Sequence, residues 1–162
     1  MNNIDIEVFH KNCGEILRLG LSLDGTLSNF LANYFSSAKT NNRNFILEDF
    51  FIDITFGKKI ELFKEICDRE INDFGNKNLI QGEIDNIKNA LGIVNSARNK
   101  VAHHFAMINH EGVLSLNTGK SVTSIKQDTL VDEVLVKKVG INTQIAQKGL
   151  NNMLIILNIG QN

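Results

Sequence analysis

The stretch IQGEIDNIKNALGIVNSARNKVAHH, residues 80–104, decides the fold. Aliphatic side chains recur along it in steps of three and four residues, at Ile80, Ile84, Ile87, Leu91, Val94 and Val101. This spacing places them on one side of an α-helix, because a helix completes a turn in about 3.6 residues. One position of the stripe carries Arg98 in place of an aliphatic residue. The stretch therefore predicts an amphipathic central helix with a charged interruption near its C-terminal end.

A second stripe with the same spacing precedes it and predicts one long first helix over residues 6–34. Gly20 occupies one position of this stripe, where we expect a bend. The polar residues 36–44 predict a loop, and residues 47–52 predict a short helix. The members of the stripe are Phe9, Cys13, Ile16, Leu23, Leu27, Phe30 and Tyr34.

Thr55 is a candidate N-cap for a further helix that ends near Gly75, since threonine caps helix starts and glycine follows helix ends. We expect residues 76–78 to form a turn. The stripe of this helix is Phe56, Ile60, Phe63, Cys67, Ile71 and Phe74.

After the central helix the pattern changes, and residues 105–117 predict a small β-hairpin or a pair of extended segments. Asp128 is a candidate N-cap for a long last helix that extends to about residue 159. Gly140 and Gly149 are the expected weak points of that helix.

The composition fits a single all-α domain, residues 1–162. A chain of 162 residues can bury a core, 43% of them are hydrophobic, and none is proline, the residue that interrupts helices most reliably. The two cysteines, Cys13 and Cys67, lack the spacing of a zinc site or a disulfide framework, so we expect both to be small core residues. The chain is thus expected to be a helical bundle with long first, central and last helices.

Charge and hydropathy restrict the location and the partners. The formal net charge of −1 argues against a protein that coats long nucleic acid, which requires many basic side chains. Basic residues exceed acidic ones only after residue 80, so an anion site is expected in the second half. No secretory signal and no apolar run long enough for a membrane span is visible, which predicts a cytoplasmic protein without membrane association.

Arg98 requires an explanation, because a guanidinium in a buried stripe keeps its charge and must find hydrogen-bond partners. One explanation is a salt bridge to a carboxylate of a neighbouring helix, such as Asp49 or Asp53. The other is that the stripe opens here into a cleft or dimer seam where an anion binds. The sequence leaves both open.

His103 and His104 follow at the expected end of the same helix. The helix dipole favours a protonated imidazole there, and such a histidine suits acid–base catalysis near neutral pH. A capping or surface role is the alternative. RNA cleavage needs a base for the 2′-hydroxyl, an acid for the 5′-oxygen and positive charge at the phosphate, all of which histidine and arginine supply without a metal.

The segment Arg98-Asn99-Lys100-Val101-Ala102-His103 resembles the signature of the HEPN superfamily: an arginine, usually a polar residue, three to five further positions and a histidine. The resemblance is specific over residues 80–104 and only architectural elsewhere. It implies a helical bundle that forms a homodimer, in which two Arg–His sets make one metal-independent RNA-cleaving site. Many members are toxins or act in abortive infection or CRISPR-linked antiviral defence, whereas others only bind or scaffold.

Carried over by position, the resemblance makes Arg98 the residue that steadies the scissile phosphate and His103 the general base or acid. Asn99 would orient the site through its amide. His104 also fits the signature, which leaves the identity of the catalytic histidine open. Lys100 is expected either to contact the RNA backbone or to be a solvated surface lysine.

Other residues offer weaker candidates. His10 and His110 lack the spacing of metal ligands and are expected on the surface, and the acidic residues Glu48, Asp49 and Asp53 are expected on a solvated helix face. Neither a metal nor another cofactor is indicated.

The leading hypothesis is thus a metal-independent endoribonuclease of the HEPN type. It would act in phage defence or in toxin–antitoxin growth arrest, with RNA as substrate and an antitoxin or defence-system component as partner, and it would leave 2′,3′-cyclic phosphate ends. The alternatives are a non-catalytic HEPN-like dimer that binds RNA or a nucleotide or acts as a scaffold, and a purely structural helical protein.

Overall fold

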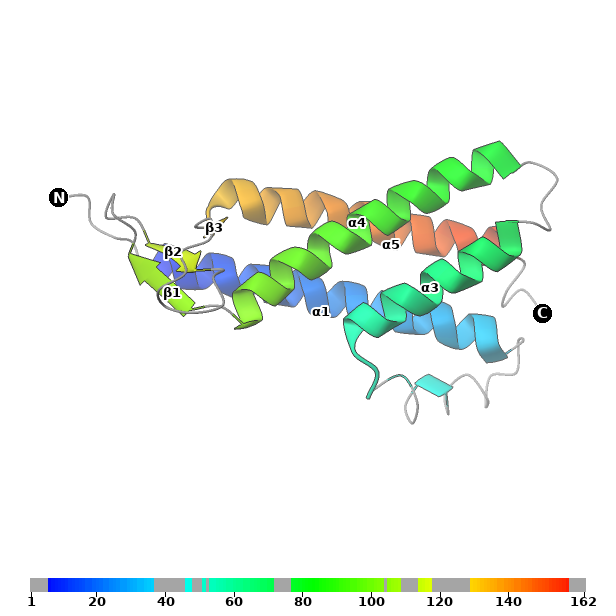
Figure 1. Cartoon of the computed structure of the whole chain (residues 1–162), viewed down its shortest axis with the longest axis horizontal. Helices are drawn as coiled ribbons and strands as arrows, with labels where there is room; N and C mark the ends of the chain where they lie inside the picture. Colours follow the sequence, from blue (N-terminus) through cyan, green and yellow to red (C-terminus); the bar gives the residue numbers. More distant parts are fainter. Residues whose placement is uncertain are drawn as a thin grey trace.

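Long helices laid side by side make up most of the computed structural model, with a small sheet at one end (Figure 1). The structure describes residues 6–36, 46–47, 51, 53–71, 77–103, 105–108, 114–117 and 129–157. Its helices there are α1 (Ile6–Ser36), α3 (Phe56–Glu70), α4 (Lys77–His103) and α5 (Glu133–Ile156). The predicted all-α fold with a small hairpin is confirmed, including the long first, central and last helices.

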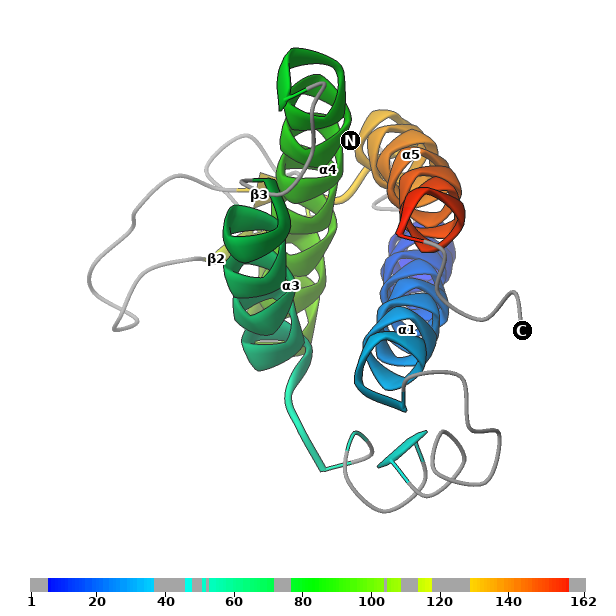
Figure 2. The ribbon, with the colours of Figure 1, turned by 90° about the vertical axis from the view of Figure 1, so that its right-hand side faces the viewer.

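Helices α1 and α5 run in the same direction, and α4 runs antiparallel to both (Figure 1). Near the start of α1, Nδ2 of buried Asn12 donates to the carbonyl oxygen of Val131 at 3.0 Å. Further along, Nε2 of Gln147 donates to Oγ of Ser22 at 3.1 Å. Seen from the end, α3 lies beside α4, and α1 lies beside α5 (Figure 2). The largest fully buried side chains are Phe30, Phe51, Phe56, Phe63, Ile16, Leu23, Leu27, Leu31, Ile84, Ile87, Leu91 and Leu150.

The interface between α1 and α3 includes an aromatic contact and a buried ion pair. The rings of Phe30 and Phe63 meet edge to face, with centroids 5.3 Å apart. Lys59, only 4% exposed, places Nζ 2.7 Å from Oδ1 of Asp24. A buried ammonium is tolerable because this carboxylate neutralises it.

The helix boundaries confirm one predicted cap and correct others. Thr55 caps α3, and its hydroxyl accepts from the Lys58 amide at 3.3 Å. However, α3 ends at Glu70, earlier than the expected Gly75, and α4 already begins at Lys77, so the turn expected over residues 76–78 is wrong. Residues 72–76 lie outside the described part of the chain.

The cap of the last helix is Asp132, not Asp128. Oδ1 of Asp132 accepts from the Leu135 amide at 2.8 Å, and α5 begins at Glu133. The prediction failed because either aspartate has the chemistry of a cap, but the chain after residue 128 is extended as strand β3 (Thr129–Leu130) and pairs with the sheet. Such pairing is not visible in the local sequence.

Helix α1 continues through Gly20, and α5 continues through Gly140 and Gly149. Gly149 is a packing position, since a Cβ built there would lie 2.4 Å from Cγ1 of Ile87 on α4. The absence of a side chain allows α4 and α5 to approach closely. Gly149 is therefore a contact between helices, not the expected weak point.

The predicted hairpin is present as strands β1 (Phe105–Ile108) and β2 (Leu114–Asn117), paired antiparallel with Ile108 opposite Leu114. Strand β3 adds to β2, which gives the order β1-β2-β3. Of β2, Leu116 is buried in the core. The sheet lies at the end of the bundle where α4 ends and α1 and α5 begin (Figure 1).

Two predicted segments fall mainly outside the described residues. Of the loop expected over residues 36–44, Ser36 belongs to α1 and the rest is not described. Of the helix expected over residues 47–52, Leu47 and Phe51 are described, and the Phe51 amide donates to the Ile46 carbonyl at 3.0 Å. Within the described chain, no helix combines the length and the apolar character that crossing a membrane requires.

Candidate functional site

Arg98 lies in the turn before the last turn of α4, on the side that faces α1. Its position continues the stripe of Leu91 and Val94, as predicted, and its side chain is half-buried. The aliphatic part packs against Gly20: a Cβ built on this glycine would lie 3.0 Å from Cδ, 3.2 Å from Cγ and 3.3 Å from Cβ of Arg98. The missing side chain in one helix thus makes room for the arginine of the other.

The guanidinium of Arg98 extends from this contact to Asn99, the next residue of α4. Nη1 donates to Oδ1 of Asn99 at 3.5 Å, the long limit of a hydrogen bond. Asn99 is itself half-buried. The structure therefore brings together these two residues of the predicted site, with the arginine stem against Gly20 and the guanidinium beside Asn99.

The salt bridge considered for Arg98 is not found among the described residues. No carboxylate of this part of the chain pairs with the guanidinium, whereas ion pairs are formed by Arg18, Lys58, Lys59, Arg69 and Lys88. Asp53, one of the two proposed partners, is exposed and does not pair with it; Asp49, the other, lies outside the described residues. Pairing of Arg98 with Asp53 is therefore wrong, because the arginine packs toward Gly20 of α1 instead.

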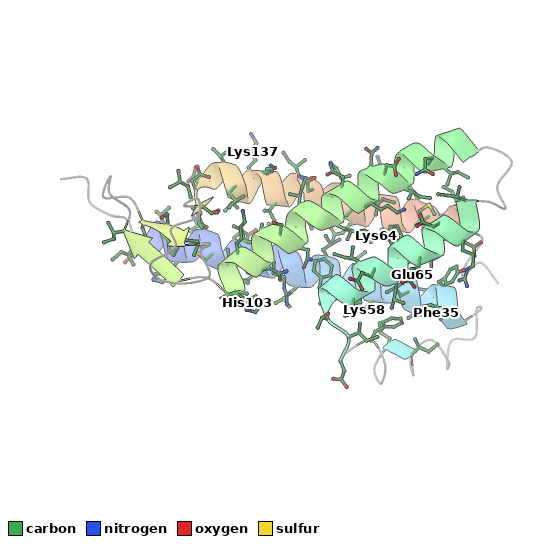
Figure 3. The ribbon with its side chains drawn as sticks, in the orientation of Figure 1. Phe35, Lys58, Lys64, Glu65, His103 and Lys137 are labelled. Atoms are coloured by element: carbon green, nitrogen blue, oxygen red, sulfur yellow. The ribbon has the colours of Figure 1, made fainter. Side chains whose placement is uncertain are left out.

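His103 is the last residue of α4 and is exposed at its C-terminal end (Figure 3). The unpaired carbonyl groups of a helix end create negative potential there, which favours a cation. Lys100 shares this last turn. His104, the second histidine of the motif, lies outside the described residues.

Arg98 and His103 occupy different sides of α4. Five residues of α-helix correspond to a rotation of about 140° and a rise of about 7.5 Å. The arginine points toward α1, and the histidine lies on the side turned away from the core. A single α4 therefore presents the arginine and the histidine of the motif in different directions.

A groove of about 400 Å³ lies on the other side of α4, between α4, the start of α5 and strand β3. Three lysines contribute to its wall: Lys88 and Lys100 from α4 and Lys138 from α5. The remaining lining residues are Asn89, Gly92, Ile93, Ser96, Ala97, Thr129 and Leu135. Lys100, a candidate RNA contact in the sequence, is therefore half-buried in the wall of a groove and is not a fully solvated lysine.

The groove was not predicted from the sequence. Lys88, Gly92, Ser96 and Lys100 of its α4 wall recur in steps of four, so a stripe without large apolar side chains was a readable signal. Lys138 lies nearly forty positions after Lys100 in the sequence. Only the packing of α5 against α4 brings these two lysines to the same groove. Lys88 also pairs with Asp68 of α3, with Nζ 2.7 Å from Oδ1.

The cysteines do not offer a nucleophile. Cys67 is buried, and burial raises the pKa of its thiol to about 12, while burial also raises the pKa of Cys13. A thiol with a raised pKa is protonated and unreactive at neutral pH. Both cysteines are free, and both contribute to the core or pack against it, as predicted.

Of the remaining sequence candidates, the structure describes His10 and Asp53. His10 is exposed and contacts the ring of Phe9 edge to face. His110, Glu48 and Asp49 lie outside the described residues. Within the ranges that the structure covers, no group of three or more histidine, cysteine or carboxylate side chains is arranged to hold a metal ion.

Comparison with known proteins identifies no relative. No family model matches the chain, and neither a curated protein nor a solved structure shows significant similarity to it. The resemblance to the HEPN superfamily therefore depends on the motif at residues 98–103 and on the helical architecture alone.

Proposed function

We propose that this protein is a metal-independent endoribonuclease of the HEPN type that cleaves RNA at a composite site between two copies of the chain. The observation that carries the proposal is Arg98. It is half-buried, the described residues supply it with no carboxylate, Asn99 lies beside it, and His103 follows at the helix end. Keeping a cation partly out of water without a counter-ion costs free energy, and an anionic substrate recovers it.

The proposed reaction uses only these side chains. A neutral histidine takes the proton of the 2′-hydroxyl, the 2′-oxygen forms a bond to phosphorus, and the bond from phosphorus to the 5′-oxygen breaks. A protonated histidine gives its proton to the leaving 5′-oxygen, so that the products are a 2′,3′-cyclic phosphate and a 5′-hydroxyl. Arg98 neutralises the charge on the phosphate as it becomes five-coordinate, and Asn99 orients the guanidinium.

The orientation of the motif supports the involvement of two copies. One chain offers His103 at a helix end, with Arg98 turned by about 140° from it. Two copies related by a two-fold axis would present each histidine to the arginine of the partner and provide two proton carriers. We therefore expect a homodimer in solution, which light scattering measures directly; a strictly monomeric protein would contradict the composite site.

The decisive experiment is an RNA cleavage assay with end-group analysis in the presence of EDTA. The parent is expected to cleave and to leave 2′,3′-cyclic phosphate ends. Arg98→Ala should lower the rate by about 10² to 10³-fold, as for other lost transition-state donors, and His103→Ala by about 10² to 10⁴-fold. A His104→Ala variant decides which histidine acts. Arg18→Ala and His10→Ala are matched controls, because both side chains are exposed and neither belongs to the motif.

Growth of the expressing cell separates the proposal from its main alternative. An active enzyme should arrest growth unless a partner such as an antitoxin or a defence-system component restrains it, and Arg98→Ala should relieve the arrest. A non-catalytic HEPN-like dimer that binds RNA or a nucleotide would leave growth unchanged, and its motif variants would lose affinity in place of turnover. The groove with three lysines is the observation that favours binding.

A further inference from the structure

The groove between α4 and α5 has the composition of an anion site. Among the lining residues that the structure describes, Lys88, Lys100 and Lys138 are cationic, Asn89, Ser96 and Thr129 are polar and uncharged, and none is acidic. Side chains that donate hydrogen bonds thus surround a volume of about 400 Å³, which lies in the range of small-ligand pockets, about 300 to 1,000 Å³. A lining of this kind selects a ligand with negative charge.

The floor of the groove is open at Gly92. A Cβ built on this residue meets no heavy atom within 4 Å, so the space above the glycine is not filled by a neighbouring side chain. Ile93, Ala97 and Leu135 supply apolar surface beside it. Cationic walls over a partly apolar floor suit a ligand that carries both phosphate and a flat or apolar part, as a nucleotide chain does.

The groove leads toward the end of α4 that carries the motif. Asn89, Ser96, Lys100 and His103 follow one another in steps of seven, four and three residues, which places them along one side of the helix. His103 thus continues the line of groove residues, whereas Arg98 lies on the other side of α4. A strand that occupies the groove would run toward the histidine.

We propose that the groove holds the sugar–phosphate backbone of the RNA strand beside the cleavage position, with Lys100 and Lys138 as phosphate contacts. The proposal rests on the endoribonuclease function proposed above and adds the path of the substrate. Such contacts bind backbone without reading its sequence.

Binding of a short fluorescein-labelled single-stranded RNA to the full chain, followed by anisotropy, tests the groove. All variants are made in a background that carries both His103→Ala and His104→Ala, so that turnover does not interfere whichever histidine acts. Lys138→Gln should weaken binding about five- to tenfold and lower the slope of log affinity against log salt concentration by about 0.7, the value for one phosphate contact to a single strand. Lys137→Gln is the matched control, because Lys137 is the neighbouring exposed lysine, points away from the bundle and does not line the groove (Figure 3).

Filling the groove gives a second, independent readout. Gly92→Leu places a side chain in the open space and replaces glycine by a better helix former, so we expect a folded protein with at least tenfold weaker RNA binding. Gly82→Leu is its control, because Gly82 is also an exposed α4 residue with no atom near its missing Cβ and lies outside the groove. Circular dichroism verifies that both variants fold.

The outcomes separate this proposal from the catalytic one. Equal binding by Lys138→Gln and Lys137→Gln, or unimpaired binding by Gly92→Leu, would overturn the groove even if the parent cleaves RNA. Loss of affinity in both groove variants would support the groove even if the parent does not cleave. AMP serves as a competitor. If AMP displaces the RNA from the protein with an intact groove, at concentrations that do not displace it from the groove variants, the groove is a free-nucleotide pocket. The assignment to an RNA strand would then be wrong.

Discussion

Two cationic side chains of neighbouring helices contact helix α1 at positions one turn apart, and their surroundings differ. Asp24 meets Lys59 of α3, which is 4% exposed and fully neutralised at 2.7 Å. Gly20 meets the stem of Arg98 of α4 and offers no charge. The first contact belongs to a closed interior, together with the Phe30–Phe63 pair. The second belongs to the C-terminal part of α4, where no carboxylate of the described residues pairs with the arginine.

This difference teaches how to separate a structural cation from a functional one. A buried charge that serves the fold brings its counter-ion, because an unpaired one would destabilise the native state. A glycine opposite a cation supplies space without neutralisation. We therefore expect substitutions in the closed interior to change stability, and substitutions around Arg98 to change activity.

The largest expected effect compares the two cations directly. Lys59→Met leaves Asp24 without its partner in a mostly buried position and should lower the free energy of unfolding by about 3 kcal/mol, the low end for a broken buried pair. Arg98→Met keeps an aliphatic stem against Gly20 and should change the free energy of unfolding by less than about 0.5 kcal/mol. Urea denaturation of both variants measures the contrast. Equal losses would contradict the distinction, and Asp24→Asn should recover part of the Lys59→Met loss.

The next effect concerns the closest glycine contact. Gly149→Ala forces a Cβ against Cγ1 of Ile87 at 2.4 Å and against Cδ1 at 2.8 Å. Overpacking of this kind costs about 1 to 3 kcal/mol, which exceeds the gain of about 1 kcal/mol from alanine in a helix. We expect a net loss of up to about 2 kcal/mol in thermal or urea unfolding. Gly140→Ala, whose nearest contact is an ordinary 3.9 Å to Leu19, should stabilise instead.

Gly20→Ala tests whether space for Arg98 matters more to activity than to stability. The new methyl group meets a flexible side chain at 3.0 to 3.3 Å, which can shift, so the helix-propensity gain of about 1 kcal/mol roughly offsets the strain. The displaced guanidinium should lower RNA cleavage about tenfold, because small misplacements of catalytic groups are costly. The RNA cleavage rate and the free energy of unfolding, both measured on this variant, decide between the two roles. A variant that loses stability but keeps its rate would assign this contact to the fold.

The smallest effect lies in the interior and depends on pH. The thiol of Cys67 has a pKa of about 12 in the folded protein and about 9.0 when unfolded, so the unfolded state loses its proton first. This group leaves stability unchanged below pH 9 and lowers it above, by about 1 kcal/mol for the first pH unit. The difference in urea stability between the parent and Cys67→Ala, measured at pH 8 and pH 10, isolates it. A stability difference that is the same at pH 8 and at pH 10 would mean that the thiol is open to water.

Much of the fold was readable from the sequence, because helix periodicity and capping are local. The stripes predicted α1, α4 and the start of α3, and Thr55 was the correct cap. The choice of Asp128 over Asp132 failed because the pairing of β3 with β2 determines where α5 can begin. A strand of two residues carries no periodic signal.

The candidate site likewise combines features that the sequence shows with features that only the structure shows. By itself, the sequence determined that Arg98 interrupts an apolar stripe and that a histidine follows at the helix end, because both statements concern one helix. Only the tertiary structure decided that Gly20 faces the arginine, that Asp53 does not pair with it, and that Lys138 joins Lys100 in one groove. These relations join residues far apart in the chain, and the packing of long helices sets them at distances that no local pattern encodes.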